Sequence, residues 1–368
     1  MKLVVLTHQK QIDESRRKWD ALAVSHPFCN WNWMSSWYEV FGDSDINRVV
    51  AIEEAGTWHG LLPLILRTTA QGRSLAFASS GRACADYVSP LVHPGSEDIV
   101  IPTFCHWIQE QLNDPQQKID FLEFEGVAAD CPIFQALIAE LENQGYKATR
   151  QPIEGCWVTK IDKPWNVFES EIKKSFRRKV RKAGKNEQLP EVSVVKCDSE
   201  QSLPGVWGEF VRLHQLRRQV LGQPGCFVDA QFETFLRKAI GKMIADRQAH
   251  LIGAKYHNEM FASVLLLTGG NRTYMYQTGH DPKRKELEPG HLLGRLAIQH
   301  AMKLGHESFD FLRGDEPYKA NWNTERIALE KVNIISKRLQ SRIRHSLWET
   351  GRAIKNWLPA SLISPSQV

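Results

Sequence analysis

The spacing of apolar residues along the chain predicts an alternation of strands and helices. Short apolar or alternating runs that end at glycine, proline or asparagine are typical of strands. The strands are predicted at residues 48–52, 58–66, 75–78, 118–124, 191–196, 249–255, 260–267, 272–278, 309–312 and 327–335.

Apolar residues that recur every three or four positions predict the helices. Trp33, Trp37 and Phe41 form one such stripe, which is more typical of a core than of a ligand site. Ser96 is placed to cap a helix whose first turn is acidic. The helices are predicted at residues 29–41, 96–112, 131–143, 167–185, 203–218, 230–247 and 290–304.

The order of the predicted elements repeats along the chain. In the first half, three strands precede the helix at 96–112 and a strand with Asp-Phe-Leu at 120–122. In the second half, three strands precede the helix at 290–304 and a strand with Asp-Phe-Leu at 310–312. A shared tripeptide is weak support alone, but the shared element order indicates two copies of one α+β module.

Chain length agrees with this duplication, because 368 residues are too many for one ordinary domain. Pro152, Gly155 and Pro164 indicate a boundary at 151–165. We expect each module to have a mixed, mostly antiparallel sheet flanked by helices. The predicted parts are an N-terminal module at 1–150, a linker with a basic helix at 151–190, a C-terminal module at 191–336 and a basic amphipathic tail at 337–368.

Composition narrows the functional classes. Hydrophobic residues make up 42% of the chain, enough for a sizeable core, and the net charge of +5 does not call for a DNA partner. Seven scattered cysteines without a Cys-x-x-Cys pair predict neither a disulfide framework nor a metal site, and they favour a reducing cytoplasm. The N-terminus does not resemble a signal peptide, and the longest apolar stretch, 61–66, is too short to span a membrane.

One helix start has the chemistry of an anion site. The strand at 272–278 leads through a polar loop to Pro289 and Gly290, where the helix begins. The first helical turn has free backbone N–H groups, and Gly290 allows an anion to approach them. The stretch is equally consistent with a pyrophosphate site and with an ordinary helix start.

Several stretches resemble a known family. They are WNWMSSWYEVFG, LLPLIL, ADYVSPL, KKSFRRKVRKA, LHQLRRQVLGQPGCF, EPGHLLGRLAI and FDFLRGDEPYKANW, within residues 25–335. They are similar to the CelD-like acetyltransferases of cellulose and exopolysaccharide biosynthesis. That family is a branch of the GNAT superfamily and is related to the FemA/FemB/FemX transferases, which contain two fused GNAT modules. Of the usual GNAT pyrophosphate loop, only Pro289-Gly290 remains.

This resemblance implies transfer of an acyl group, acetyl from acetyl-CoA first of all, to an amine or hydroxyl, without a metal. A backbone N–H of the central strand, within 274–278, is then expected to polarise the thioester carbonyl. The expected donor-binding residues are Tyr276, Gln277, Thr278, Pro289, Gly290, His291 and Leu292.

The stretch ESFDFLRGDEPYKANW, at 307–322, supplies the polar groups for catalysis. Asp310, Asp315 and Glu316 are candidate general bases, and Tyr318 is a candidate proton donor to the departing thiolate. Alternatively, the acids are solvated and Tyr318 is a packing residue. The first copy of the repeat has no counterpart of the Tyr-Lys pair, which favours 314–322 as the functional part.

Further residues are expected to hold the acceptor. Lys319 can bind a phosphate or carboxylate, or pair with Glu316 instead, and Trp322 is a candidate substrate contact. On the basic helix, Arg177, Arg178 and Arg181 can bind a diphosphate sugar, the CoA 3′-phosphate or a tRNA backbone. A solvated charge run is the plainer alternative.

Three functions remain open. The first is acyl-CoA-dependent transfer to a sugar, sugar nucleotide or small amine in exopolysaccharide or cell-envelope biosynthesis. The second is a FemX-like transferase that uses aminoacyl-tRNA. The third is a non-catalytic partner of a polysaccharide synthase complex. The basic amphipathic segment at 336–359 is expected to dock on the domain, or alternatively to lie on an anionic membrane. We expect a cytoplasmic protein, with peripheral membrane contact in the second case.

Overall fold

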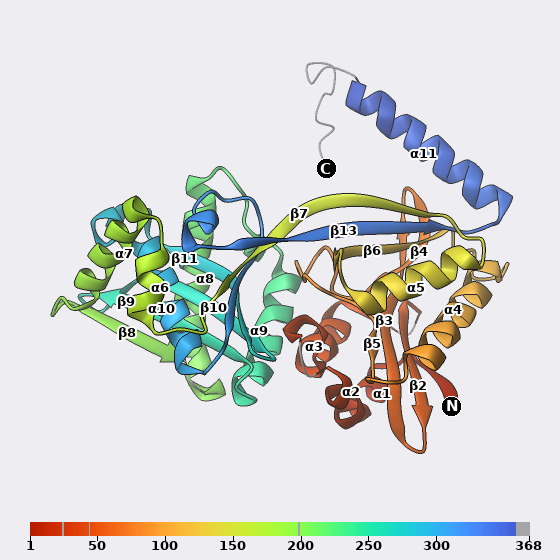
Figure 1. Ribbon diagram of the computed structural model, residues 1–368, viewed down its shortest axis with the longest axis horizontal. Coiled ribbons are helices and arrows are strands. Elements are labelled where there is room, and N and C mark those ends of the chain that lie inside the picture. Colours follow the sequence, from red (N-terminus) through yellow and green to blue (C-terminus); the bar gives the residue numbers. More distant parts are fainter. Residues whose placement is uncertain (24–25, 44, 198, 358–368) are drawn as a thin grey trace.

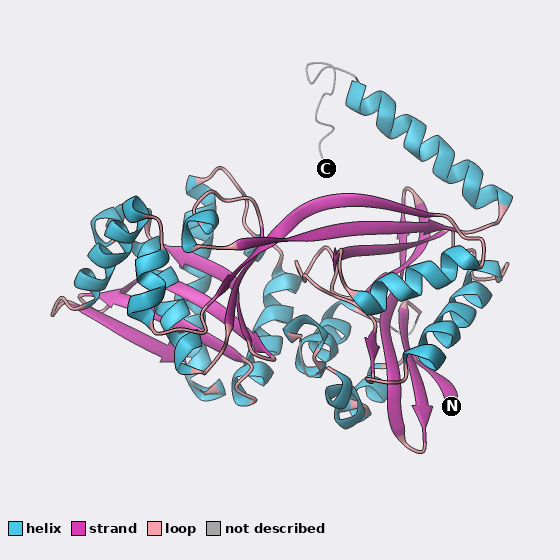
Figure 2. Cartoon of the chain, viewed as in Figure 1, coloured by secondary structure: helices cyan, strands magenta, loops and turns pink. Residues whose placement is uncertain are grey.

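The computed structural model describes residues 1–23, 26–43, 45–197 and 199–357. Two modules share one continuous 13-stranded sheet, with helices packed on its faces (Figures 1 and 2). The strand order is β1-β2-β3-β4-β6-β13-β7-β12-β11-β10-β9-β8, and β5 pairs with β3.

The first module contains the N-terminal half of this sheet. Its elements are β1 (Lys2–Leu6), α1 (Gln9–Glu14), α2 (Arg16–Leu22), α3 (Trp31–Phe41), β2 (Asn47–Glu54), β3 (Thr57–Thr69), β4 (Gly72–Phe77), β5 (Leu91–Val92), α4 (Glu97–Asn113), β6 (Phe121–Ala128), α5 (Pro132–Asn143) and β7 (Ala148–Lys160).

The second module follows, and a terminal helix ends the described chain. Its elements are α6 (Trp165–Glu171), α7 (Lys174–Glu187), β8 (Val192–Cys197), α8 (Leu203–Val220), α9 (Ala230–Ala245), β9 (Ala249–Tyr256), β10 (Glu259–Gly269), β11 (Arg272–His280), α10 (Pro289–Lys303), β12 (Ser308–Arg313), β13 (Glu325–Ile335) and α11 (Leu339–Trp357).

The predicted duplication is confirmed. In each copy an antiparallel meander is followed by a helix and a strand that returns parallel to the third strand, because β4 pairs with β6 and β11 pairs with β12 in parallel. The helix between the paired strands is α4 in the first copy and α10 in the second.

The two copies exchange strands at the centre of the sheet. β13, the last strand, inserts between β6 and β7 and pairs with both. β7 in turn inserts between β13 and β12, so that its C-terminal half belongs to the second module. Figure 1 shows these two long strands crossing side by side from one module to the other. Each module therefore depends on the other for a central strand.

Three local expectations differ from the structure. The segment around 151–160, predicted as the start of a linker, is the C-terminal part of β7. The helix predicted at 167–185 is two helices, because Ile172 and Lys173 adopt extended backbone angles between α6 and α7. The elements β1, α1 and α2 were not predicted.

Apolar packing joins the modules across the face opposite α10. Trp33 on α3 is fully buried and makes edge contacts with Phe235 and Tyr276 of the second module, at ring-centroid distances of 4.9 and 5.3 Å. One continuous buried cluster includes residues of both modules.

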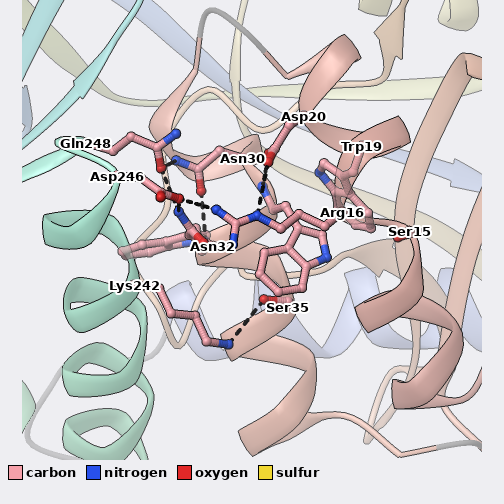
Figure 3. Close-up of polar contacts among 12 residues, drawn as sticks. Ser15, Arg16, Trp19, Asp20, Asn30, Asn32, Ser35, Lys242, Asp246 and Gln248 are labelled. Atoms are coloured by element: carbon pink, nitrogen blue, oxygen red, sulfur yellow. Dashed lines mark hydrogen bonds and ion pairs between the residues drawn. The ribbon is translucent and has the colours of Figure 1, made fainter.

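Polar contacts surround this apolar junction (Figure 3). The Asn32 amide donates to Asp246 at 2.6 Å and to Gln248 at 2.9 Å. Arg16 pairs with Asp246, and Lys242 donates to Ser35 at 3.4 Å. The modules are therefore fixed to each other by strand exchange, apolar packing and hydrogen bonds together.

We predict that Trp33→Leu lowers the free energy of unfolding by about 2–3 kcal/mol, because it leaves a cavity in the core shared by both modules. Urea unfolding followed by circular dichroism and by fluorescence measures this loss, and both probes should report one transition. Trp348→Leu, at a partly exposed tryptophan of α11, is the control and should change the value by less than about 0.5 kcal/mol. An unchanged midpoint, or separate transitions for the two modules, would contradict a shared core.

Candidate active site

The second module opens into a fork between two parallel strands. β11 and β12 pair only at residues 272–274 and 308–310, and beyond these residues the strands separate. The register of β11 against β10 shifts at this point, which makes Tyr276 the extra residue of a bulge. Backbone groups of Met275–Thr278 that face β12 consequently have no strand partner.

Two adjoining cavities occupy the fork. One of 340 Å³ lies between the strands, and one of 450 Å³ extends to the N-terminus of α10. Both are lined by Arg218, Met275, Thr278, Glu316 and Tyr318. The two cavities therefore form one cleft with Glu316 and Tyr318 at its middle.

The α10 end of the cleft provides backbone donors. Pro289 lacks an N–H group, so Gly290 and His291, which line the larger cavity, carry the free N–H groups of the first turn. The acid beside them, Glu288, is paired with Lys182 at 3.1 Å and with His291 at 3.1 Å. Gln277 and Tyr276 line the smaller cavity, whereas Leu292 is buried in the core.

The first module closes the other end of the cleft. Gly81, Cys84 and Asp86, from the loop after β4, line the smaller cavity, together with Glu125 of β6 and Glu154 of β7. None of these residues was among the candidates, although the similar stretch ADYVSPL lies within the same loop. The smaller cavity is thus built by both modules and is rich in carboxylates.

An ion pair holds the loop to this end. Arg313, directly after the fork, contacts Asp86 at 2.8 Å and Glu125 at 3.5 Å, and its backbone N–H donates to Asp86. Burial raises the pKa of Asp86, and the Arg313 charge opposes that shift. The Tyr276 hydroxyl also donates to the carbonyl of Ala83, at 2.8 Å.

Lys319 borders the smaller cavity, but its side chain is almost completely buried beneath the turn that follows β12. Its ammonium donates to the carbonyls of Leu312, Arg313 and Gly314 at 3.1, 2.8 and 3.3 Å, and it pairs with Glu316 at 2.8 Å. Gly314 has φ +126°, a conformation that L residues rarely adopt. With these partners, Lys319 folds the turn and orients Glu316, in agreement with the alternative of a Lys319–Glu316 pair.

Asp310 is also fully buried and does not line the cleft. It accepts hydrogen bonds from the Tyr87 hydroxyl at 2.8 Å and from the Leu312 N–H at 2.7 Å. The bond to Leu312 holds that residue at φ +58°, where β12 bulges away from β7. Asp310 therefore holds the backbone of β12 from outside the cleft, and its role as a general base stays a prediction.

The other candidate residues of the stretch 307–322 lie in three places: in the cleft, on the surface outside it, or in the core. Tyr318 and Glu316 reach the cleft, whereas Asp315 lies outside it and contacts Arg326 at 3.6 Å. Trp322 is buried, stacks on Phe311, packs closely over Gly294 and does not line the cleft. Burial raises the pKa of Tyr318, which keeps its hydroxyl protonated at neutral pH.

The basic helix α7 packs along α10 beside the cleft. Its buried face includes Phe176, which lines the larger cavity and contacts His291 at 4.8 Å. Arg177 and Arg181 face α6 instead, where Arg177 donates to the Ser170 carbonyl and Arg181 pairs with Glu169. Arg178 is exposed.

Lys179 and Lys182, which were not predicted, lie on the side of α7 that faces the start of α10. Lys182 pairs with Glu288, and the charge of Lys179 contributes to lowering the pKa of His291, after the larger effect of burial. Lys182 and Lys179 are therefore the α7 cations that act on the start of α10, and Arg217 and Arg218 of α8 line the larger cavity there.

The equivalent fork of the first module is filled. β4 and β6 pair only at 74–76 and 121–123, but the loop after β4 packs against β6, where the Tyr87 N–H donates to the Gly126 carbonyl at 2.7 Å. The first turn of α4 contains Glu97 and Asp98, which repel anions, whereas the first turn of α10 has no acid. Only the second module offers an open fork with an anion-compatible helix start.

Comparisons with known proteins agree with this location. Residues 170–320 match the model of the acetyltransferase (GNAT) domain. The crystal structure of FemX has a TM-score of 0.64 at 14% identity, over 90% of this chain and 97% of FemX. The C-terminal domain of a putative lysylphosphatidylglycerol synthetase from Agrobacterium fabrum has a TM-score of 0.56 at 10% identity, over 92% of this chain and 96% of that domain.

A conserved protein of unknown function from Bacteroides thetaiotaomicron has a TM-score of 0.59 at 7% identity, over 91% of this chain and 100% of that protein. No curated protein matches the sequence. The predicted GNAT resemblance is confirmed for residues 170–320, and the chain is similar in fold to FemX over 90% of its length. The closer likeness to the CelD branch stays a prediction.

A pH-dependent stability is expected from the buried Asp310. Burial raises its pKa to about 6, whereas an unfolded aspartate titrates near about 3.9. The folded state thus holds the proton more tightly, and stability falls as pH rises from about 4 to about 6. Because Asp310→Asn does not titrate, the wild-type free energy of unfolding should fall relative to the variant's by up to about 3 kcal/mol between pH 4 and pH 7. Urea unfolding at several pH values measures this difference, and parallel pH profiles would contradict it.

Proposed function

We propose that the protein is an acyltransferase whose second module binds acyl-CoA in the β11–β12 fork and transfers the acyl group to an acceptor in the smaller cavity. The observation that carries the proposal is the single cleft, with free helix N–H groups at one end and Glu316 and Tyr318 at its middle. Acyl-CoA supplies an activated thioester, so no metal is required.

Donor binding would use the α10 end. The N–H groups of Gly290 and His291 suit a pyrophosphate, and Lys179 and Lys182 add positive charge beside them. A backbone N–H group of Met275–Thr278 that faces β12, and so has no partner on that strand, would stabilise the negative charge that develops on the thioester oxygen. Strands that separate at this point leave room for an extended donor arm between them.

Proton transfer would involve the two residues at the middle of the cleft. The carboxylate of Glu316, oriented by the buried Lys319, would accept the proton of the attacking amine or hydroxyl, directly or through water. The protonated Tyr318 hydroxyl would return a proton to the departing thiolate. Asp310 and Lys319 contribute by holding the turn between β12 and Tyr318.

The acceptor would enter from the side built by the first module. Its carboxylates can hydrogen-bond sugar hydroxyls or attract an amine, so a sugar, sugar nucleotide or small amine of cell-envelope or exopolysaccharide synthesis fits the polar lining. A FemX-like transfer from aminoacyl-tRNA is the second candidate, because Lys174 and Arg178 leave an exposed basic face on α7. A non-catalytic partner of a synthase complex would not require the open fork.

Acetyl-CoA binding and turnover test the proposal. Calorimetry should detect acetyl-CoA binding, and thiol release in the presence of amine and amino-sugar acceptors should report transfer. Tyr318→Phe should lower kcat by about 10²-fold or more with little change in KM, because it removes only the proton donor. Tyr256→Phe, on β9 outside the cleft, is the matched control. Absence of binding at millimolar acetyl-CoA, or full activity of Tyr318→Phe, would refute the proposed chemistry.

Two double substitutions on α7 distinguish acetyl-CoA from aminoacyl-tRNA as the donor. Lys179→Ala with Lys182→Ala should weaken acetyl-CoA binding by roughly ten-fold, since both cations lie beside the start of α10. Arg178→Ala with Arg181→Ala removes the same charge from elsewhere on the helix and should leave acetyl-CoA affinity unchanged. Calorimetry measures both variants. The tRNA-dependent function would be favoured by two results together. The wild-type protein would retain aminoacyl-tRNA but not bind acetyl-CoA, and Arg178→Ala with Arg181→Ala would abolish that retention.

A further inference from the structure

The terminal helix α11 is attached to the first module by its polar side. Ser341 is buried and its hydroxyl donates to Asp120 at 2.8 Å. Arg338 and Arg344 form ion pairs with the same carboxylate. Beyond this anchor, Figure 1 shows α11 extending away from the body of the protein.

The apolar stripe of α11 faces solvent as a result. Leu339, Ile343 and Leu347 are spaced at i, i+4 and i+8 on one helix face, and they are 72%, 51% and 69% exposed. Trp348 adds a partly exposed indole next to this stripe. An amphipathic helix normally buries its apolar side against its own domain, whereas here the side that binds the domain is polar. Something else must therefore cover the stripe.

Charge identifies what can cover it. Residues 337–357 contain six Lys and Arg and one Glu, a net +5. Arg338 and Arg344 share the Asp120 carboxylate, and the segment stays positive after that pairing. A second copy of the helix would bring the same positive charge and would be repelled at close range. An anionic surface with an apolar interior is complementary to both features.

We propose that α11 binds in the plane of an anionic phospholipid surface, with Leu339, Ile343 and Leu347 inserted among the acyl chains near the headgroups. Arginine and lysine side chains at the border of the stripe, such as the exposed Arg342, contact lipid phosphates. Among the described residues, no helix is both long and apolar enough to cross a membrane. This inference is independent of the chemistry in the cleft.

Vesicle co-sedimentation of the full chain tests the proposal. The protein should bind equimolar phosphatidylcholine–phosphatidylglycerol vesicles, bind pure phosphatidylcholine vesicles much more weakly, and dissociate as salt is raised. Ile343→Ser with Leu347→Ser should reduce binding at least about ten-fold, because two apolar side chains no longer enter the interface. Ile99→Ser with Leu189→Ser removes exposed apolar side chains of the same kind elsewhere and should not change binding.

Two results would overturn the proposal. Binding that is equally strong to both vesicle types, or unchanged in Ile343→Ser with Leu347→Ser, would show that α11 does not recognise anionic lipid. Sedimentation equilibrium without lipid tests the alternative of a second copy. If the wild-type protein dimerises with rising concentration and Ile343→Ser with Leu347→Ser does not, a second copy covers the stripe instead. Since the substituted residues are exposed, circular dichroism should report an unchanged fold.

Discussion

The exchange of β7 and β13 is the constraint on which the rest of the molecule depends. Each of these strands pairs with a strand of the other module, so neither sheet is complete alone. The backbone hydrogen bonds of the exchange would have to break before the modules could move apart. The cleft, which contains residues of both modules, is therefore built on two modules that the sheet holds together.

The same constraint explains how two copies of one module came to differ. Both forks open at the same point, but the loop after β4 fills the first and then reaches across to the second through Tyr87 and Asp86. The first module's loop thereby occupies its own fork and forms a wall of the second module's cleft. Its helix start is acidic and would repel an anion.

Much of the fold was predictable because it depends on local periodicity. The apolar patterns of α3, β10 and α10 are strong and independent of distant partners. β7 was not predictable, because its first half is largely exposed, contains Pro152 and Gly155, and is defined by pairing with a strand far along the sequence. The break between α6 and α7 has no proline or glycine to mark it, and it coincides with the burial of Ile172.

The site was predictable to the level of the segment but not of the side chain. Glu316 and Tyr318 reach the cleft because they follow a strand end, and Gly290 because it begins a helix, where such residues are expected. Gln277 reaches it from within β11, next to the bulge. A sequence cannot tell that a lysine will be buried under carbonyl groups, as Lys319 is, because buried lysines are rare. Nor does it tell which side of a basic helix faces its neighbour, which is why Lys179 and Lys182 were missed.

The position of β13 in the sequence also constrains how the protein is made. During synthesis, the first module emerges with β6 and β7 complete, but the strand that belongs between them ends only at Ile335. Until then the nascent first module has two unpaired sheet edges, which are prone to wrong pairing. A stalled or truncated chain would thus differ from the finished one by an open seam in the middle of the sheet. The nascent chain would therefore need protection from wrong pairing until β13 has been synthesised.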